Sequence, residues 1–119
     1  MASVLVVDDA AFMRMSIRKM LEDNGHSVAG EASNGVEAIE KYIVLKPDIV
    51  LLDISMPEMN GLEALRRIKE IDKDSKIIIC SAMGQQQLLA KAVEYGVNDF
   101  IVKPFEPSRL MAAIEKVLK

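Results

Sequence analysis

Four short apolar runs in this chain of 119 residues end directly before residues whose side chains could take part in chemistry. The runs span 4–7, 49–52, 77–80 and 100–102, and the residues that follow them are Asp8 with Asp9, Asp53, Ser81 and Lys103. Short apolar runs that alternate with helical patterns are typical of the strands of a parallel sheet. Parallel strands end at one edge of their sheet, where open α/β sheets bind ligands. We therefore expect three carboxylates, a hydroxyl and an ammonium at a single site.

Asp8, Asp9 and Asp53 would place three negative charges at this site. Two carboxylates about 4–5 Å apart repel each other by roughly 3–4 kcal/mol at an effective dielectric constant of about 20, so a proton, a lysine or a divalent cation must offset the repulsion. Mg²⁺ suits this role because it prefers hard oxygen ligands and combines one or two carboxylates with phosphate oxygens. Asp53 could then attack phosphorus as a nucleophile and form an acyl phosphate. In the alternative interpretation, Asp8 and Asp9 cap a helix and Asp53 begins a loop.

Lys103 and Ser81 would complete the site. The ammonium of a lysine is a compact charge that suits a phosphate or carboxylate oxygen. A serine hydroxyl can donate a hydrogen bond to a phosphoryl oxygen. Taken alone, Lys103 would be a solvated surface lysine and Ser81 an ordinary turn residue. The position of each at the end of a predicted strand favours the functional interpretation.

Length and composition predict one domain over residues 1–119, because a chain of this size buries a single core. No run approaches the ~18 apolar residues that a membrane span needs, which predicts no membrane association. The first strand begins almost at once and leaves no room for a signal peptide. The lone Cys80 fits a reducing cytoplasm. The net charge of −3 and the scattered basic residues argue against nucleic acid as a partner.

Helical patterns separate the apolar runs. Five stripes of apolar residues predict amphipathic helices, whose inward positions are Met13, Ile17, Met20 and Leu21; Val36, Ile39, Tyr42 and Ile43; Leu62, Leu65 and Ile68; Leu88, Leu89, Ala92 and Val93; and Leu110, Ile114, Val117 and Leu118. Asn34 with Glu37 three residues later is an N-cap signal, and Pro107 favours a first helical turn. The range Ser27–Ala32 predicts a weaker strand that suits an edge. These five βα units predict a doubly wound α/β fold with helices on both faces of a parallel sheet.

Four motifs together resemble the receiver domains of two-component signalling systems. They are Asp8-Asp9, the run 53–61 (DISMPEMNG), Ser81-Ala82 and the run 100–105 (FIVKPF). Each fragment alone is weakly specific, whereas their combined spacing is highly specific and the resemblance covers essentially the whole chain. With no output module attached, the chain is most similar to the receivers of chemotaxis. The resemblance implies a five-stranded, flavodoxin-like parallel sheet in the order 2-1-3-4-5, flanked by five helices.

The resemblance also implies a role for each acidic residue. Asp53 would accept the phosphoryl group. Asp53 and Asp9 would ligate Mg²⁺ directly, together with the backbone carbonyl of Ser55. Asp8 would reach the ion through a water molecule.

Three further roles follow from the same resemblance. Lys103 would hold a phosphoryl oxygen, and the Lys103–Pro104 peptide bond would be cis, which costs little before proline. Ser81 would swing toward the phosphoryl group as a switch residue. Phe100 stands where the better-known chemotaxis receivers carry a tyrosine switch. A phenylalanine can fill space behind Ser81 but has no hydroxyl to offer a partner, and the alternative is that Phe100 is simply a core residue.

The implied function is a signalling module that is no enzyme beyond catalysing its own phosphorylation and dephosphorylation. It would receive phosphoryl from a histidine kinase, bind a flagellar motor switch protein when phosphorylated, and depend on a dedicated phosphatase, as a cytoplasmic monomer. The alternatives within the family are a receiver of a sporulation-type phosphorelay or one excised from a DNA-binding regulator. A metal-dependent phosphatase is disfavoured because that class usually carries a second aspartate two residues after the nucleophile, where Ser55 stands. A nucleotide-binding protein is disfavoured because no glycine-rich phosphate loop follows any predicted strand.

Several other residues that could carry chemistry receive structural interpretations. His26, the only histidine, is expected to be an exposed loop residue away from the acidic edge. Cys80 ends a fully apolar strand and is expected to be a buried, inert thiol. Met13 and Met20 fall on the inward stripe of the first helix and are expected to fill gaps in the core.

Overall fold

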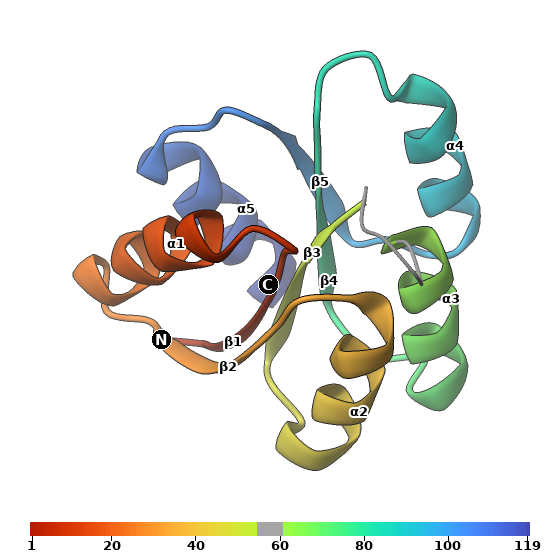
Figure 1. Ribbon diagram of the computed structural model, residues 1–119, viewed down its shortest axis with the longest axis horizontal. Helices are drawn as coiled ribbons and strands as arrows, with labels where there is room; N and C mark the ends of the chain where they lie inside the picture. Colours follow the sequence, from red (N-terminus) through yellow and green to blue (C-terminus); the bar gives the residue numbers. More distant parts are fainter. Residues whose placement is uncertain (55–60) are drawn as a thin grey trace.

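The chain folds as an open parallel sheet with helices on both of its faces (Figure 1). The computed structural model describes residues 1–54 and 61–119. Within these ranges the strands are β1 (Ser3–Val7), β2 (Ser27–Ala32), β3 (Ile49–Asp53), β4 (Ile77–Ser81) and β5 (Asp99–Val102). The helices in the same ranges are α1 (Ala11–Asp23), α2 (Gly35–Leu45), α3 (Gly61–Ile71), α4 (Gln86–Glu94) and α5 (Pro107–Leu118). All neighbouring strands are parallel, in the order β2-β1-β3-β4-β5. The predicted α/β class and the strand order implied by the resemblance are both confirmed.

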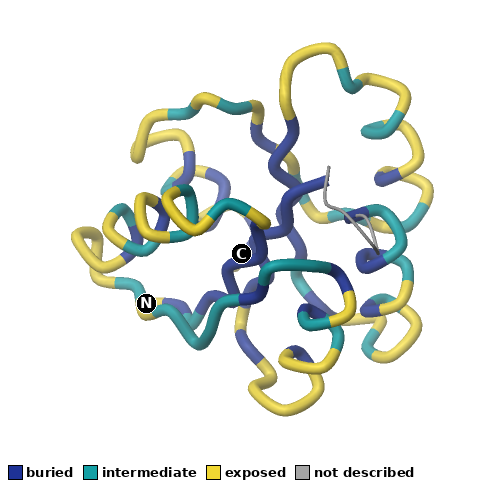
Figure 2. The backbone as a smooth tube through the Cα atoms, in the orientation of Figure 1, coloured by how far each residue is buried: buried dark blue, intermediate teal, exposed yellow. Residues whose placement is uncertain are grey.

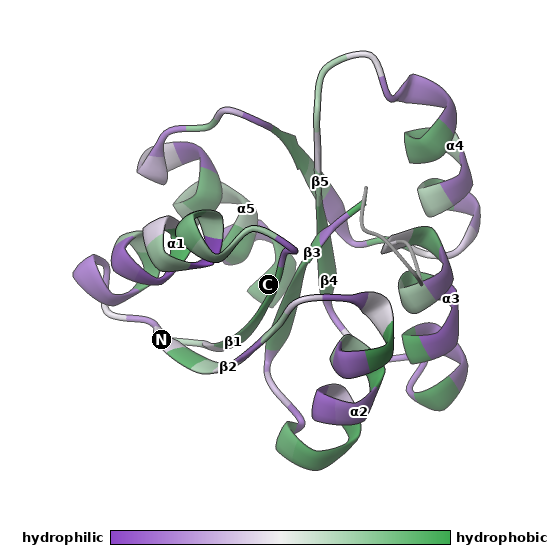
Figure 3. Ribbon diagram, in the orientation of Figure 1, coloured by the Kyte–Doolittle hydropathy of each residue, from purple (hydrophilic) through white to green (hydrophobic). Residues whose placement is uncertain are grey.

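Each central strand contributes side chains to two cores, one on each face of the sheet. In β3, Val50 and Leu52 point into one core, while Ile49 and Leu51 point into the other, as the two-residue period of a strand requires. Helices α2, α3 and α4 cover the first core, and α1 and α5 cover the second (Figure 1). The strands β1, β3 and β4 are therefore buried on both faces (Figure 2), which explains their unbroken apolar sequence (Figure 3).

The helix limits follow from local sequence signals. The side chain of Asn34 accepts a 2.9 Å hydrogen bond from the backbone N–H of Glu37 and caps α2, as predicted. Glu37 in turn accepts from the N–H of Ser33, the residue before the cap, at 2.9 Å, so the first turn of α2 is fastened to the chain that enters it. Pro107 begins α5 directly after the N-cap residue Glu106, also as predicted. Among the described helices, none combines the length and the apolar character needed to cross a membrane.

The two edges of the sheet are less deeply covered than its centre. The edge position predicted for Ser27–Ala32 is confirmed, since β2 lies outside β1 and is only partly buried. The opposite edge is β5, in which Ile101 is buried while Phe100 and Val102 are exposed. The strand that leads to Lys103 thus carries apolar side chains on the surface.

Four positions predicted to face inward are exposed instead. They are Val36, Ile43, Val93 and Leu118. Each of them directly follows a buried residue, respectively Gly35, Tyr42, Ala92 and Val117. Adjacent residues on a helix are turned by about 100° from one another, so at the margin of the buried face one residue faces the core while the next faces solvent. By contrast, Met13 and Met20 pack against the core beneath α1, as expected.

Candidate functional site

Three aspartates meet at the carboxyl edge of the sheet, as the order of strands and helices predicted. β1 and β3 are paired, with Val7 beside Leu52, so Asp8 follows β1 next to Asp53 at the end of β3. One carboxylate oxygen from each of Asp8, Asp9 and Asp53 lies within 4.8 Å of the other two. We call these three residues the acidic cluster. Asp8 and Asp53 are only 2% and 7% exposed, whereas Asp9 faces solvent, so two of the three charges are withdrawn from water.

Asp8 is held on every side by hydrogen bonds. Its Oδ1 accepts from the backbone N–H of Ala10 at 2.9 Å, and its Oδ2 accepts from the ammonium of Lys103 at 2.8 Å. Its own backbone N–H donates to the carbonyl oxygen of Ala32 in β2 at 3.0 Å. The N-cap residue of α1 is Ala10, which has no side-chain cap, so the interpretation of Asp8 and Asp9 as mere helix caps is wrong.

Lys103 reaches into the acidic cluster from the end of β5. Its Nζ lies 2.8 Å from Oδ2 of Asp8 and 3.5 Å from Oδ2 of Asp53. Burial by itself lowers the pKa of Lys103, but the bond to Asp8 and the charges of both aspartates outweigh burial and raise the pKa above its ordinary value. Lys103 is therefore a charged component of the site and no solvated surface lysine. One ammonium balances at most one of the three carboxylates.

The main chain around Lys103 joins the neighbouring strand end. Its backbone N–H donates to the carbonyl oxygen of Ser81 at 2.7 Å, and the Lys103–Pro104 bond is cis, as the resemblance implied. Ser81 ends β4 and is fully buried. Within the described ranges its Oγ makes no hydrogen bond. A buried hydroxyl left unpaired costs about 1–3 kcal/mol, so a hydrogen-bond partner for this Oγ would stabilise the chain.

Gly61 lets the acceptor strand and α3 meet closely. A Cβ at position 61 would lie 2.3 Å from the carbonyl oxygen of Asp53 and 2.6 Å from Cα of Ile54, which no side chain can occupy. The N–H of Gly61 donates to the carbonyl oxygen of Ile54 at 3.1 Å. The glycine thus fixes the backbone just after Asp53 against the first turn of α3. Ser55, whose carbonyl the resemblance assigned to the metal, lies outside the described residues.

Phe100 lies on the outer edge strand and is 38% exposed, so it is no fully buried core residue. Its backbone carbonyl accepts a 3.0 Å hydrogen bond from Nη2 of Arg109 in α5. Val102 in the same strand and Val93 in α4 are also exposed. Exposed apolar side chains are therefore present on both α4 and β5, and Val102 directly precedes Lys103.

Arg14 contacts the acidic cluster and was missed by the reasoning from sequence. It lies in the first turns of α1 and donates from Nη1 to the backbone carbonyl of Asp8 at 2.6 Å. It also donates to the carboxylate of Glu31 in β2 at 3.0 Å. The available signal was its place five residues after Asp9, but an arginine on a predicted helix is too common to single out.

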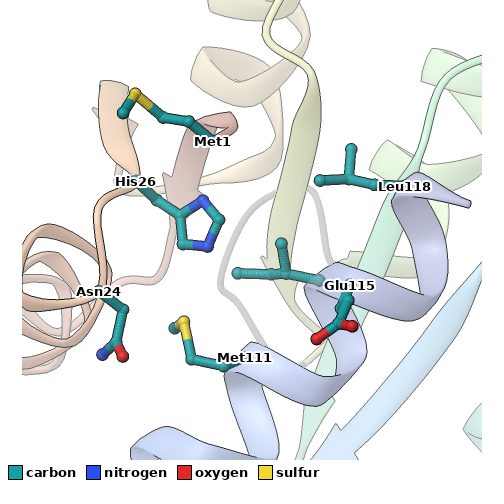
Figure 4. Close-up of a pocket in the computed structure, with 7 residues that line it drawn as sticks. Met1, Asn24, His26, Met111, Glu115 and Leu118 are labelled. Atoms are coloured by element: carbon teal, nitrogen blue, oxygen red, sulfur yellow. The ribbon is translucent and has the colours of Figure 1, made fainter.

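His26 and Cys80 lie outside the cluster. His26 lies in the loop between α1 and β2, as expected, but its predicted exposure is wrong: it is partly buried, and its Nδ1 accepts a 3.0 Å hydrogen bond from the backbone N–H of Ala2. Figure 4 shows its ring in a pocket of about 320 Å³ between the end of α1 and the helix α5, at the amino end of the strands. Cys80 is buried as expected, and burial raises the pKa of its thiol far above the ordinary value.

This sheet order and this acidic edge define a response regulator. The family described as the response regulator receiver domain matches residues 4–115 of the chain. The chain therefore belongs to the response regulator receiver domain family, and it is a signalling module rather than a conventional enzyme.

Several similar relatives are chemotaxis proteins. The chain is 59% identical to the chemotaxis protein CheY of Thermotoga maritima over 116 residues, which cover 98% of this chain and 97% of that protein. It is 54% identical to the chemotaxis protein CheY of Bacillus subtilis over 115 residues, or 97% of this chain and 96% of that one. The chain is thus a receiver domain of the CheY-like chemotaxis type.

Solved structures agree with this assignment. The CheX-CheY-BeF3-Mg complex from Borrelia burgdorferi contains a chain that superposes with a TM-score of 0.93 at 34% identity, over 98% of this chain and 89% of that one. A response regulator of the LuxR family from Aurantimonas superposes with a TM-score of 0.92 at 33% identity, over 98% and 84% of the two chains. Both solved structures therefore share the fold of this chain.

Proposed function

We propose that Asp53 accepts a phosphoryl group from a histidine kinase of a chemotaxis pathway and that phosphorylation switches the affinity of the chain for a flagellar motor switch protein. The observation that carries the proposal is the acidic cluster, in which a buried strand-end aspartate faces two further carboxylates and one lysine. The similarity to CheY proteins supports the choice of pathway. The chain would catalyse only its own phosphorylation and dephosphorylation.

In the chemical step, a carboxylate oxygen of Asp53 forms a bond to phosphorus while the P–N bond of the phosphohistidine breaks. The imidazole nitrogen keeps the electron pair of that bond. The ammonium of Lys103, already 3.5 Å from Asp53, would bind a phosphoryl oxygen. The buried hydroxyl of Ser81 would donate to another oxygen and so gain the partner that it lacks within the described ranges.

The acidic cluster fits Mg²⁺ by the chemistry of its donors. Three carboxylate oxygens within 4.8 Å of one another are hard ligands, and Lys103 offsets only part of their charge. In our proposal Asp9 and Asp53 bind the ion directly, together with the carbonyl of Ser55, and Asp8 binds through water. When bound, the ion neutralises the charge that builds up between the carboxylate and the incoming phosphoryl group.

Ser81 and Phe100 are the proposed switch residues. Ser81 leads into α4, and the backbone bond between Ser81 and Lys103 joins the end of β4 to β5, the strand of Phe100. If phosphorylation draws Ser81 inward, Phe100 can move into the space behind it, and the surface of α4, β5 and α5 changes. The exposed apolar residues of that surface suit a short segment of a motor switch protein.

A dedicated phosphatase is also part of the proposal. Met83, two residues after Ser81, is 81% exposed and has no strong hydrogen-bonding group to position an attacking water molecule. The phosphorylated chain should therefore lose its phosphoryl group slowly by itself. In the Borrelia structure a CheY is found in complex with CheX, so a CheX-like protein is our candidate partner.

The remaining parts of the proposal concern the state of the chain. We propose that residues 1–119 act as one receiver domain, as a monomer in the cytoplasm, with no nucleic acid or membrane as a partner. The match of the family over residues 4–115 supports the single domain.

Phosphorylation of the purified chain tests the proposal. Acetyl phosphate and Mg²⁺ should produce an acyl phosphate on Asp53, which borohydride reduction and mass spectrometry can locate. Asp53→Asn should abolish the label completely. Label on another aspartate of the wild type, or unchanged label in Asp53→Asn, would contradict the proposal.

The choice of pathway needs a separate test. The chain should bind motor switch proteins more tightly with beryllofluoride and Mg²⁺ than without them. The chain could instead be phosphorylated on Asp53 and bind no switch protein, either with or without beryllofluoride. That result would favour the alternatives, a phosphorelay receiver or a receiver from a DNA-binding regulator.

A further inference from the structure

Arg14 ties the main chain of the acidic cluster to the edge strand β2. Its Nη1 donates to the carbonyl oxygen of Asp8 at 2.6 Å, and its Nε donates to Oε1 of Glu31 at 3.0 Å. Its side chain is only 18% exposed, so both bonds are partly shielded from water. The carbonyl of Asp8 belongs to the planar peptide unit that precedes Asp9. The guanidinium therefore fixes the plane from which the side chain of Asp9 projects.

Glu31, the second partner of Arg14, is itself firmly held. Arg18, one turn further along α1, donates to Oε2 of Glu31 from Nε at 3.0 Å and from Nη2 at 2.8 Å. The bonds from Arg18, together with Arg14 and against the effect of burial, lower the pKa of Glu31 below its ordinary value. Glu31 thus remains an anion that is hydrogen-bonded to both arginines. Only Arg14 reaches onward to Asp8.

Asp9 differs from the other two aspartates in how it is placed. Asp8 is fixed through both carboxylate oxygens by Ala10 and Lys103. Asp9 is exposed, and its position relative to Asp53 depends on the backbone that carries it. A group that holds the Asp8–Asp9 peptide therefore controls the distance between two carboxylates of the cluster.

We propose that Arg14 is a positioning residue for Mg²⁺, which acts by holding the Asp8–Asp9 peptide so that the carboxylate of Asp9 meets that of Asp53. This inference rests on the proposed function, because it concerns the same ion. The positive charge of Arg14, taken alone, would weaken Mg²⁺ binding instead of supporting it. A guanidinium beside the acidic cluster repels a divalent cation, so its loss would strengthen Mg²⁺ binding if charge were its only effect.

The variant Arg14→Lys separates these two effects. Lysine keeps the positive charge but lacks the rigid fork with which arginine serves two acceptors on different elements. We expect its Mg²⁺ dissociation constant, measured by isothermal titration calorimetry, to rise by on the order of 10-fold, as for other groups that orient metal ligands. The matched control is Arg18→Lys, which disturbs the same carboxylate of Glu31 without touching Asp8. Its Mg²⁺ affinity should equal that of the wild type.

A second variant and a second measurement complete the test. Arg14→Gln should also weaken Mg²⁺ binding, although it removes a repelling charge. In Arg14→Lys the Mg²⁺ concentration that half-saturates phosphorylation by acetyl phosphate should rise, while the rate at saturating Mg²⁺ stays that of the wild type. A merely structural role would not produce this pattern.

Three results would overturn the inference alone: unchanged affinity in Arg14→Lys, stronger binding in Arg14→Gln, or equal losses in Arg14→Lys and Arg18→Lys. Each of them would occur in a protein whose wild type binds Mg²⁺ and is phosphorylated. A wild type that does not bind Mg²⁺ would overturn the proposed metal site as well, so the two failures can be told apart.

Discussion

Two partly buried lysines stand at opposite ends of the sheet, and their partners differ in charge. Lys103, at the carboxyl end, contacts the carboxylates of the acidic cluster, which raise its pKa despite burial. Lys69 of α3, at the amino end, donates to the backbone carbonyl of Ser75 and to Oδ1 of Asn98, which are neutral oxygens. Burial, with the charge of Lys76, lowers the pKa of Lys69. The same residue type thus serves two ends of one sheet under opposite electrostatic conditions.

The difference teaches how a structural network can be told from a functional one. At the amino end, Oδ1 of Asn98 also accepts from the N–H of Ile77 at 2.8 Å, so the network closes on itself and fastens α3 to β4 and β5. At the carboxyl end, three carboxylates face one lysine, so negative charge is in excess there. Matched polar groups hold a fold together, whereas an excess of like charge marks a place where a ligand binds.

The largest expected effect is on metal affinity. Asp9→Ala should weaken Mg²⁺ binding by on the order of 100-fold, since even groups behind a ligand cost 10–100-fold. Asp72→Asn, which alters a carboxylate at the amino end, should bind Mg²⁺ as the wild type does. Calorimetric titration measures both. Equal affinity in the wild type and Asp9→Ala would place the ion away from this cluster.

Mimicking phosphorylation should change the structure at the carboxyl end of the sheet and leave the amino end unchanged. Beryllofluoride with Mg²⁺ should raise the affinity for a motor switch segment by about 5–150-fold, the usual range of coupling between two sites. Amide chemical shifts should change over residues 86–95 and 109–116 and remain constant at Lys69 and Asn98. Changes restricted to α1 and α2 would show that the signal leaves by another surface.

Removal of each lysine should destabilise the chain in a different way. Lys69→Met leaves the carbonyl of Ser75 without its donor and should lower the free energy of unfolding by about 1–2 kcal/mol, with or without Mg²⁺. Lys103→Met leaves carboxylates unbalanced and should cost about 1–3 kcal/mol in EDTA, a loss that Mg²⁺ offsets. Urea unfolding of both variants in the two conditions measures this. A Mg²⁺ response in Lys69→Met equal to that in Lys103→Met would remove the distinction between the two ends.

The smallest effect concerns alkaline pH. Burial and the bond to Asp72 raise the pKa of Tyr42 from 10.0 to about 12. As the pH rises, the unfolded chain loses the phenolic proton before the folded chain does. The stabilisation that the protonated Tyr42 gives the folded state is therefore complete below pH 10 and is lost as the pH rises toward 12. At pH 11 the loss should be about 1 kcal/mol. Tyr42→Phe should flatten the pH dependence of urea unfolding above pH 10, and an unchanged slope would contradict the assignment.

The carboxyl edge could be predicted from sequence because strand direction alone brings strand ends together. Asp8, Asp53, Ser81 and Lys103 each follow an apolar run, and parallel pairing places those ends side by side without knowledge of any side-chain conformation. The convergence of the three aspartates is confirmed. The roles assigned to these residues in catalysis and metal binding stay predictions.

What could not be predicted depends on directions that only the folded chain defines. The contact of Arg14 with Asp8 requires the angle at which α1 leaves the sheet. The exposure of Val93 requires knowing which of two adjacent apolar residues faces the core. The partial burial of His26 accompanies a hydrogen bond to its ring from the backbone N–H of Ala2, the residue before β1. Ala2 and His26 are 24 residues apart, so no local signal in the sequence connects them.

The close contact at Gly61 has a consequence for how such chains can be altered. Ile54 and Gly61 are joined by a backbone hydrogen bond, so the end of β3 and the start of α3 are fastened directly to each other. This bond does not involve the side chains at positions 55–60, so substitutions there leave its donor and its acceptor in place. Position 61 itself tolerates no side chain. Transplanting residues 55–60 from a relative should therefore carry over whatever those residues contribute, while Asp53 stays where it is.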